Sequence, residues 1–140
     1  MTLIRPVSDL HLEFSKGELS LPELDTDKDT VLVLAGDIGV AKQAWTYKPF
    51  VTEMSERFLH IIMILGNHEH YSGKLLTSHN KMRVELSELM NVDILEKDCL
   101  IINDVAFICA TLWTDMDNGN PLVMEDARNG MNDYKIIRHG

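Results

Sequence analysis

Residues 31–37 read VLVLAGD and residues 61–68 read IIMILGNH, so the chain twice places a glycine and a polar residue after a short apolar run. With Leu3–Val7, the runs Val31–Ala35 and Ile61–Leu65 have the length and apolarity of strands that are buried on both faces. The segment between the second and third runs, Ala41–Leu59, is predicted to be mainly helical despite Pro49. Strand, helix and strand in this order predict a parallel sheet with right-handed crossovers.

The rest of the chain predicts helices that flank this sheet and one hairpin. Apolar residues at three- and four-residue spacing predict a helix over Lys74–Met90. Asn103 and Asp104 separate Leu100–Ile102 from Val105–Thr111, which is typical of a β-hairpin. A further helix is expected over Leu122–Arg128. The predicted fold class is therefore α/β, with a layered β-sheet core, βαβ units and flanking helices.

Length, composition and charge restrict the class of protein. A chain of 140 residues with 45% hydrophobic residues fits one domain, spanning residues 1–140. No apolar run is long enough to cross a membrane or to act as a signal peptide, so we expect a cytoplasmic protein without membrane contact. The net charge of −9 argues against an extensive nucleic-acid-binding surface. Two cysteines, Cys99 and Cys109, form no disulfide framework and are expected to be buried.

Three polar clusters follow the three predicted strands. Residues 8–11 read SDLH, residues 36–39 read GDIG and residues 66–70 read GNHEH. Each cluster therefore lies at the carboxyl end of a parallel strand, which is the edge where open α/β sheets bind ligands. One βαβ step between successive clusters would bring all three to the same edge.

The residue types in these clusters are those of a metal site. Asp9 and His11 are two residues apart, so both side chains can reach one ion from an extended segment. Asp37 supplies a carboxylate that can bridge two ions, and Asn67 supplies a neutral amide oxygen. Such a mixed oxygen and nitrogen set suits Mn, Fe, Zn or a similar ion. His68, next to Asn67, could face the substrate and donate a proton to a leaving oxygen.

The motifs D-x-H, G-D and G-N-H-E, in this order and each after a strand, resemble those of the calcineurin-like metallophosphoesterases. The resemblance implies a hydrolase that cleaves phosphomonoesters or phosphodiesters with two divalent metal ions. Asp9 and His11 would bind the first ion, Asp37 would bridge both, and Asn67 would bind the second. His68 would act at the leaving group. Residues 110–115 (ATLWTD) and 132–134 (NDY) also resemble parts of this family.

The family pattern extends beyond this chain. Its later histidine motifs, including G-H-x-H, are absent from the sequence, and His139 is the only histidine after His79. The resemblance therefore implies an N-terminal part of a phosphoesterase domain that is truncated at its C-terminus. Two alternatives stay open: a non-catalytic interaction module or inactive fragment of the same fold, and a short protein that completes its site in a dimer. The phosphate-ester substrate, the metal and the oligomeric state are not determined by the sequence.

Several polar residues outside the proposed ligand set have structural interpretations. Glu69 is expected to support its loop through hydrogen bonds, and His79 to pack on the apolar face of its helix. His70 could contact substrate or could lie outside the site. His60 is placed at the end of a helix, where a cation is favourable. The aspartates of residues 25–29 are expected in a solvated loop.

Overall fold

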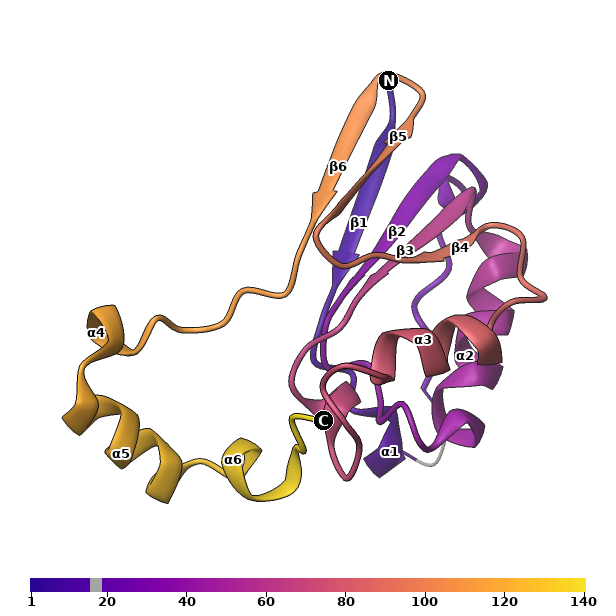
Figure 1. Cartoon of the computed structure of the whole chain (residues 1–140). Coiled ribbons are helices and arrows are strands. Elements are labelled where there is room, and N and C mark those ends of the chain that lie inside the picture. The colour runs from indigo at the N-terminus through magenta and orange to yellow at the C-terminus, as the bar shows by residue number, and fades with distance from the viewer. Residues whose placement is uncertain (16–18) are drawn as a thin grey trace.

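A computed structural model of the chain describes residues 1–15 and 19–140. Its core is a parallel sheet in the order β1 (Leu3–Val7), β2 (Thr30–Ala35), β3 (His60–Ile64) and β4 (Val92–Ile94). The first three strands confirm the predicted runs, and β4 is an addition at the far edge. Figure 1 shows the four strands side by side, with their carboxyl ends at one edge. The predicted parallel α/β fold is therefore confirmed.

The remaining elements surround this sheet. The helices that precede the hairpin are α1 (Leu12–Ser15), α2 (Ala44–Arg57) and α3 (Ser78–Glu85), with short 3-10 turns at Asp27–Asp29 and His68–His70. The predicted hairpin is formed by β5 (Asp98–Ile102) and β6 (Val105–Cys109), with Asn103 in the left-handed conformation at its turn. The C-terminal helices are α4 (Met116–Gly119), α5 (Pro121–Gly130) and α6 (Asp133–Ile136).

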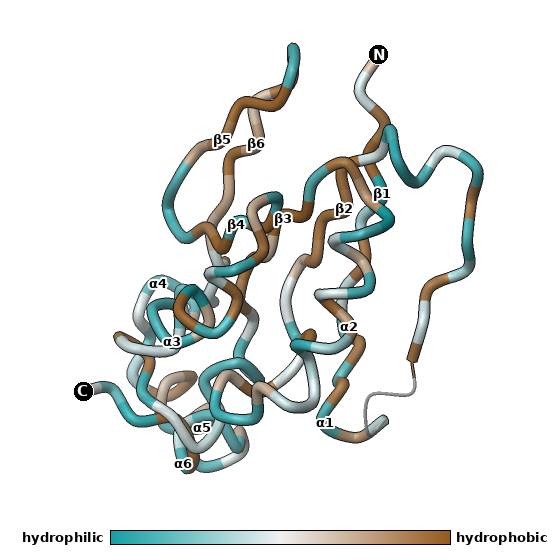
Figure 2. Tube along the Cα trace, turned by 90° about the vertical axis from the view of Figure 1, so that its right-hand side faces the viewer, coloured by the Kyte–Doolittle hydropathy of each residue, from teal (hydrophilic) through white to brown (hydrophobic). Residues whose placement is uncertain are grey.

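Alternating side chains divide the core into two layers. Leu32, Leu34, Ile61 and Met63 lie in the cluster that includes α2 and α3 residues, and all are at most 1% exposed. Their neighbours along the strands, including Val31 and Ile62, lie in a second cluster with residues of the β5–β6 hairpin. Figure 2 shows the apolar stretches concentrated in β2, β3 and the hairpin. Both faces of the central strands are therefore buried, which explains their continuous apolar sequence.

Three expectations need correction. The strand β1 is not buried on both faces, because Ile4 and Pro6, which share one face, are exposed, Ile4 to 47%. The helix expected over Lys74–Met90 is shorter, since α3 ends at Glu85 and turns follow it. Cys99 is exposed, because the outer face of the two-stranded hairpin has no covering layer within the described part of the chain. Among the described residues, no helix combines the length and apolarity needed to cross a bilayer.

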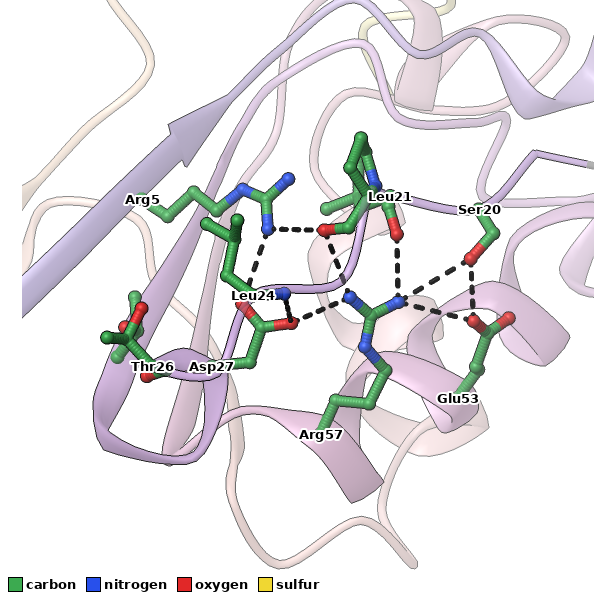
Figure 3. A network of polar contacts seen from close by, with 10 residues as sticks. Arg5, Ser20, Leu21, Leu24, Thr26, Asp27, Glu53 and Arg57 are labelled. Carbon is green, nitrogen blue, oxygen red and sulfur yellow. Dashed lines mark hydrogen bonds and ion pairs between the residues drawn. The ribbon is translucent and has the colours of Figure 1, made fainter.

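The loop at residues 25–29 also differs from expectation, because Asp27 is buried rather than solvated. Its carboxylate accepts hydrogen bonds from Arg57 at 2.7 Å and from Arg5 at 3.3 Å, as Figure 3 shows. Burial acts to raise the pKa of Asp27, but the hydrogen bonds from Arg57 and the Leu24 amide lower it below its usual 3.8. The network joins this loop to β1 and α2 at the end of the sheet opposite the polar clusters.

The C-terminal segment, residues 110–140, extends away from the sheet and then returns to it (Figure 1). None of the helices α4, α5 and α6 contains a buried residue. The return is fixed by backbone hydrogen bonds from Leu75 N to Arg138 O at 2.8 Å and from Arg138 N to Gly73 O at 3.1 Å. A third bond joins Ser72 N to Ile136 O at 3.1 Å. These bonds place α6 beside the loop that follows β3.

Candidate metal centre

The loops after β1 and β2 are joined by backbone hydrogen bonds. The Asp9 amide donates to Gly36 O at 3.1 Å, and the His11 amide donates to Asp37 O at 3.0 Å. The next bond runs from Leu12 N to Ile38 O at 2.9 Å. The ladder of the sheet thus continues past the ends of both strands, so the two predicted ligand clusters lie next to one another at the carboxyl edge.

Three of the predicted ligands adopt the left-handed backbone conformation. The φ angles of Asp9, His11 and Asp37 are 57°, 46° and 54°. This region is sparsely populated by residues other than glycine, and residues held there often lie at functional sites. The preceding Gly36 has a φ of 91°, which favours glycine. The hydrogen-bonded loops therefore hold the backbone at these residues in a conformation that an unconstrained chain would rarely adopt.

The third cluster approaches Asp37 closely because Gly66 has no side chain. A Cβ atom at Gly66 would lie 2.3 Å from Asp37 Oδ1, so a larger residue cannot be accommodated there without a shift. The same oxygen accepts a hydrogen bond from the His68 amide at 2.9 Å. The glycine thus lets the Asp37 carboxylate sit against the turn that carries Asn67 and His68.

Glu69 holds the loops after β2 and β3 together. Its carboxylate is 1% exposed and accepts from the Gly66 amide at 2.8 Å and the Ile38 amide at 2.6 Å. The amides of Asp37 and Gly39 each donate to it at 3.1 Å. Burial raises the pKa of Glu69, and the backbone hydrogen bonds oppose that rise. The predicted role of Glu69 as a hydrogen-bonding support is confirmed.

His11, Asp37 and His68 form a group that could hold a metal ion. One ligand atom from each lies within 4.8 Å of the others. In this group His11 Nδ1 is buried, as is Oε2 of neighbouring Glu13, and neither atom has a hydrogen-bond partner among the described residues. Imidazole and carboxylate are the donors that first-row divalent ions prefer, so these residues fit such an ion. Asp9 is exposed and lies outside this group, whereas His68, predicted as a proton donor, belongs to it.

Asn67 is connected to the C-terminal segment. Its Nδ2 donates to Asp133 Oδ1 at 2.6 Å and to the Tyr71 hydroxyl at 3.3 Å. Because the amide nitrogen is occupied in this way, the side-chain oxygen is left for another partner. Asp133 lies in α6, within the NDY stretch that resembles the phosphoesterase family. This hydrogen bond joins the C-terminal segment to a predicted metal ligand.

His70 and His79 lie next to one another and are not members of the group formed by His11, Asp37 and His68. His70 is 1% exposed, and its ring centroid lies 5.6 Å from that of His79 and 6.2 Å from that of Trp113. Burial lowers the pKa of His70 to about 4, and neighbouring His79 adds to the effect. His79, predicted to pack on the apolar face of its helix, is partly buried, and its Nε2 lies 3.7 Å from Glu96 Oε2. His60 is not at a helix end but opens β3, where it pairs with Asp93 at 2.8 Å.

Sequence reasoning missed Glu13. It lies in α1, two residues after His11, and its side chain is 6% exposed. The Oε1 atom lies 2.8 Å from His68 Nδ1 and 3.5 Å from His11 Nδ1. The signal available in the sequence was the acidic residue at i+2 from a candidate ligand, but a glutamate in a short polar stretch is usually exposed.

Comparison with known proteins gives two matches. No family model matches the chain. Uncharacterized protein L509 of Acanthamoeba polyphaga mimivirus is 30% identical over 151 residues, which cover 99% of this chain and 52% of that protein. The structure of phosphopantetheinyl hydrolase (PptH) from Mycobacterium tuberculosis is similar with a TM-score of 0.59 and 13% identity, covering 97% of this chain and 55% of that one.

The chain therefore spans about half the length of both proteins that it matches. At this level of identity, the likeness to the hydrolase shows a shared fold. That fold places the group of His11, Asp37 and His68 at the carboxyl edge of a parallel sheet, where α/β proteins bind their ligands.

Proposed function

We propose that the chain is part of a metal-dependent phosphoesterase, a hydrolase that cleaves phosphomonoester or phosphodiester bonds at two divalent metal ions. The observation that carries the proposal is that donor atoms of His11 and Asp37 meet at the carboxyl edge of the sheet, with a ring nitrogen of His68 within 4.8 Å of both. The fold shared with a phosphopantetheinyl hydrolase and the D-x-H, G-D and G-N-H-E motifs support it.

In this proposal, each predicted residue has one role. Asp9 and His11 would hold the first ion, Asp37 would be shared by both ions, and Asn67 would hold the second through its amide oxygen. Bound there, divalent ions would supply positive charge to the phosphoryl oxygens and lower the pKa of water. Asp9 is exposed in the structure, so its carboxylate is free to turn toward an ion.

His68 acts at the leaving group. Its Nε2 is the nitrogen left for substrate, because Nδ1 faces Glu13 at 2.8 Å. We expect Nε2 to take a proton from solvent and to give it to the leaving oxygen as the ester bond breaks. The hydrogen bond from the His68 backbone amide to Asp37 holds the backbone of His68 next to this carboxylate. Proton transfer and charge neutralisation would thus occur at adjacent positions.

The proposal is tested with p-nitrophenyl phosphate and bis-p-nitrophenyl phosphate in the presence of Mn²⁺. The wild-type protein should release nitrophenol only when the metal is present. Asp37→Asn should lose both metal binding and turnover. His68→Ala should keep metal binding and lose turnover by about 100-fold, within the range for a general acid. If His68→Ala loses the metal as Asp37→Asn does, His68 is a ligand and the proposed division of roles is wrong.

The main alternative is a non-catalytic interaction module on the same fold. The retained carboxylate and imidazole donors favour the enzyme, because a scaffold has no chemical need for them. Metal content separates the two functions. An enzyme should purify with, or readily take up, a divalent ion, and a scaffold should not.

A further inference from the structure

We infer that Glu13 is a positioning residue for His68: it holds this ring in the Nδ1–H tautomer and thereby directs Nε2 to the site. The inference deepens the proposed function, on which its catalytic consequence rests. Glu13 belongs to none of the motifs that resemble the phosphoesterases. Its role follows from its place in α1, directly after the loop that carries Asp9 and His11.

A carboxylate that is 6% exposed is costly unless polar partners surround it. Glu13 finds these partners among the site histidines. Its Oε1 is 2.8 Å from His68 Nδ1, which is hydrogen-bond distance, and 3.5 Å from His11 Nδ1. The second oxygen, Oε2, is buried and has no hydrogen-bond partner in the part of the chain that the structure describes. One carboxylate thus faces the same nitrogen of two imidazole rings.

The geometry determines the tautomer of His68. A carboxylate only accepts hydrogen bonds, so the nitrogen at 2.8 Å must carry the proton. Nδ1–H is then the donor, and Nε2 of the neutral ring has a free lone pair. Such a partner on the far nitrogen is the usual device that fixes a functional imidazole.

Two further contacts fix the ring as a whole. Tyr71 stacks on His68 with a centroid distance of 4.2 Å and an interplanar angle of 27°. His11 meets the ring edge to face at 4.3 Å. Tyr71 and His11 therefore restrict rotation of the ring about its Cβ–Cγ bond, and Glu13 selects the nitrogen that carries the proton. Loss of Glu13 would free the choice of tautomer without removing the stack.

The experiment reads the tautomer directly. Long-range ¹H–¹⁵N NMR spectra of the metal-free chain at about pH 8, where an unperturbed imidazole is neutral, distinguish Nδ1–H from Nε2–H for each histidine. Wild-type His68 should be Nδ1–H. Glu13→Ala should shift it toward Nε2–H, whereas Glu13→Gln, which keeps an acceptor oxygen, should restore Nδ1–H.

Asp93→Asn is the matched control, because Asp93 pairs with His60 at the same distance of 2.8 Å at the opposite end of β3. It should leave the His68 signals unchanged. An Nε2–H signal for His68 in the wild-type chain would overturn the inference, and this result needs no variant to fold. An unchanged His68 tautomer in a folded Glu13→Ala chain would also overturn it.

Activity provides the second readout. With Mn²⁺ and a nitrophenyl ester, Glu13→Ala should lower kcat by about 10- to 100-fold with little change in KM. Asp93→Asn should match the wild type. If the wild-type protein hydrolyses no ester but His68 responds to Glu13 as expected, the proposed function fails and the positioning role stands. If the wild type is active and Glu13→Ala is equally active, the positioning role fails and the proposed function stands.

Discussion

The loops at the carboxyl edge of the sheet and the C-terminal segment both supply residues to the candidate site, but they are held in different ways. Around Asp37, backbone hydrogen bonds join the loops that follow β1 and β2. The buried carboxylate of Glu69 accepts a hydrogen bond from the Asp37 amide. In the C-terminal segment, α4, α5 and α6 bury no residue, and Asp133 reaches Asn67 through one side-chain hydrogen bond. The proposed ligands thus lie on hydrogen-bonded loops. The C-terminal segment, which buries little surface, orients one of these ligands, Asn67.

The largest effect should come from Glu69, which four backbone amides share. Glu69→Ala leaves these buried donors without an acceptor, and each unsatisfied group costs about 1–3 kcal/mol. We expect the free energy of unfolding to fall by about 3 kcal/mol or more in urea denaturation. Glu56→Ala, on the exposed face of α2, is the control and should change little. A small loss in Glu69→Ala would mean that the loops are held by other contacts.

Asp27 tests the opposite end of the sheet. Asp27→Asn removes the charge that Arg5 and Arg57 share, and hydrogen bonds to charged groups contribute about 1.5–3 kcal/mol. Because the pKa of Asp27 is lowered in the fold, its stabilisation is present above pH 3.8 and is lost as the pH falls through its folded pKa. The difference in Tm between wild type and Asp27→Asn should therefore be large at neutral pH and shrink in acid.

Asp133 tests the link between the two regions. Asp133→Ala frees the amide of Asn67, so Mn²⁺ affinity should fall by about 10-fold, the lower limit for a residue that orients a ligand. Stability should change by less than about 0.5 kcal/mol, because α6 buries no residue. Asp126→Ala, on exposed α5, should leave Mn²⁺ affinity unchanged in the same titration. Equal Mn²⁺ affinity in Asp133→Ala and in the wild type would show that the C-terminal segment does not influence metal binding.

The smallest effect is expected in α5. Leu122 is 77% exposed, so Leu122→Ala should change the free energy of unfolding by less than about 0.5 kcal/mol. Leu34 is 0% exposed in β2, and Leu34→Ala should cost about 2–5 kcal/mol. Urea denaturation of both variants compares the same Leu→Ala substitution in the C-terminal segment and in the sheet. Similar losses would show that α5 is packed as firmly as the sheet.

The sheet and its polar edge could be predicted from the sequence because their signals are local. Each apolar run and the cluster that follows it are adjacent in the chain, and parallel strands bring such clusters together. Glu69 was identifiable for the same reason, since it lies within the third cluster.

Glu13, Asp27 and Asp133 could not be assigned in this way. Their partners are far away in the sequence: Glu13 reaches His68, Asp27 reaches Arg57, and Asp133 reaches Asn67. A polar residue in a turn-rich or weakly patterned stretch is usually solvated, and only the tertiary fold brings these three side chains to their partners. Hydrophobic periodicity contains no information about such pairings.

The central claim is that Asp37 lies at a divalent-metal site on the carboxyl edge of the sheet. Isothermal titration of the metal-free chain with Mn²⁺ tests it most directly, with Asp37→Asn as the variant and Asp93→Asn as the control. We expect saturable binding in the wild type and in Asp93→Asn, and loss of that binding in Asp37→Asn. A wild-type chain that binds no Mn²⁺, or an Asp37→Asn chain that binds it equally well, would contradict the claim.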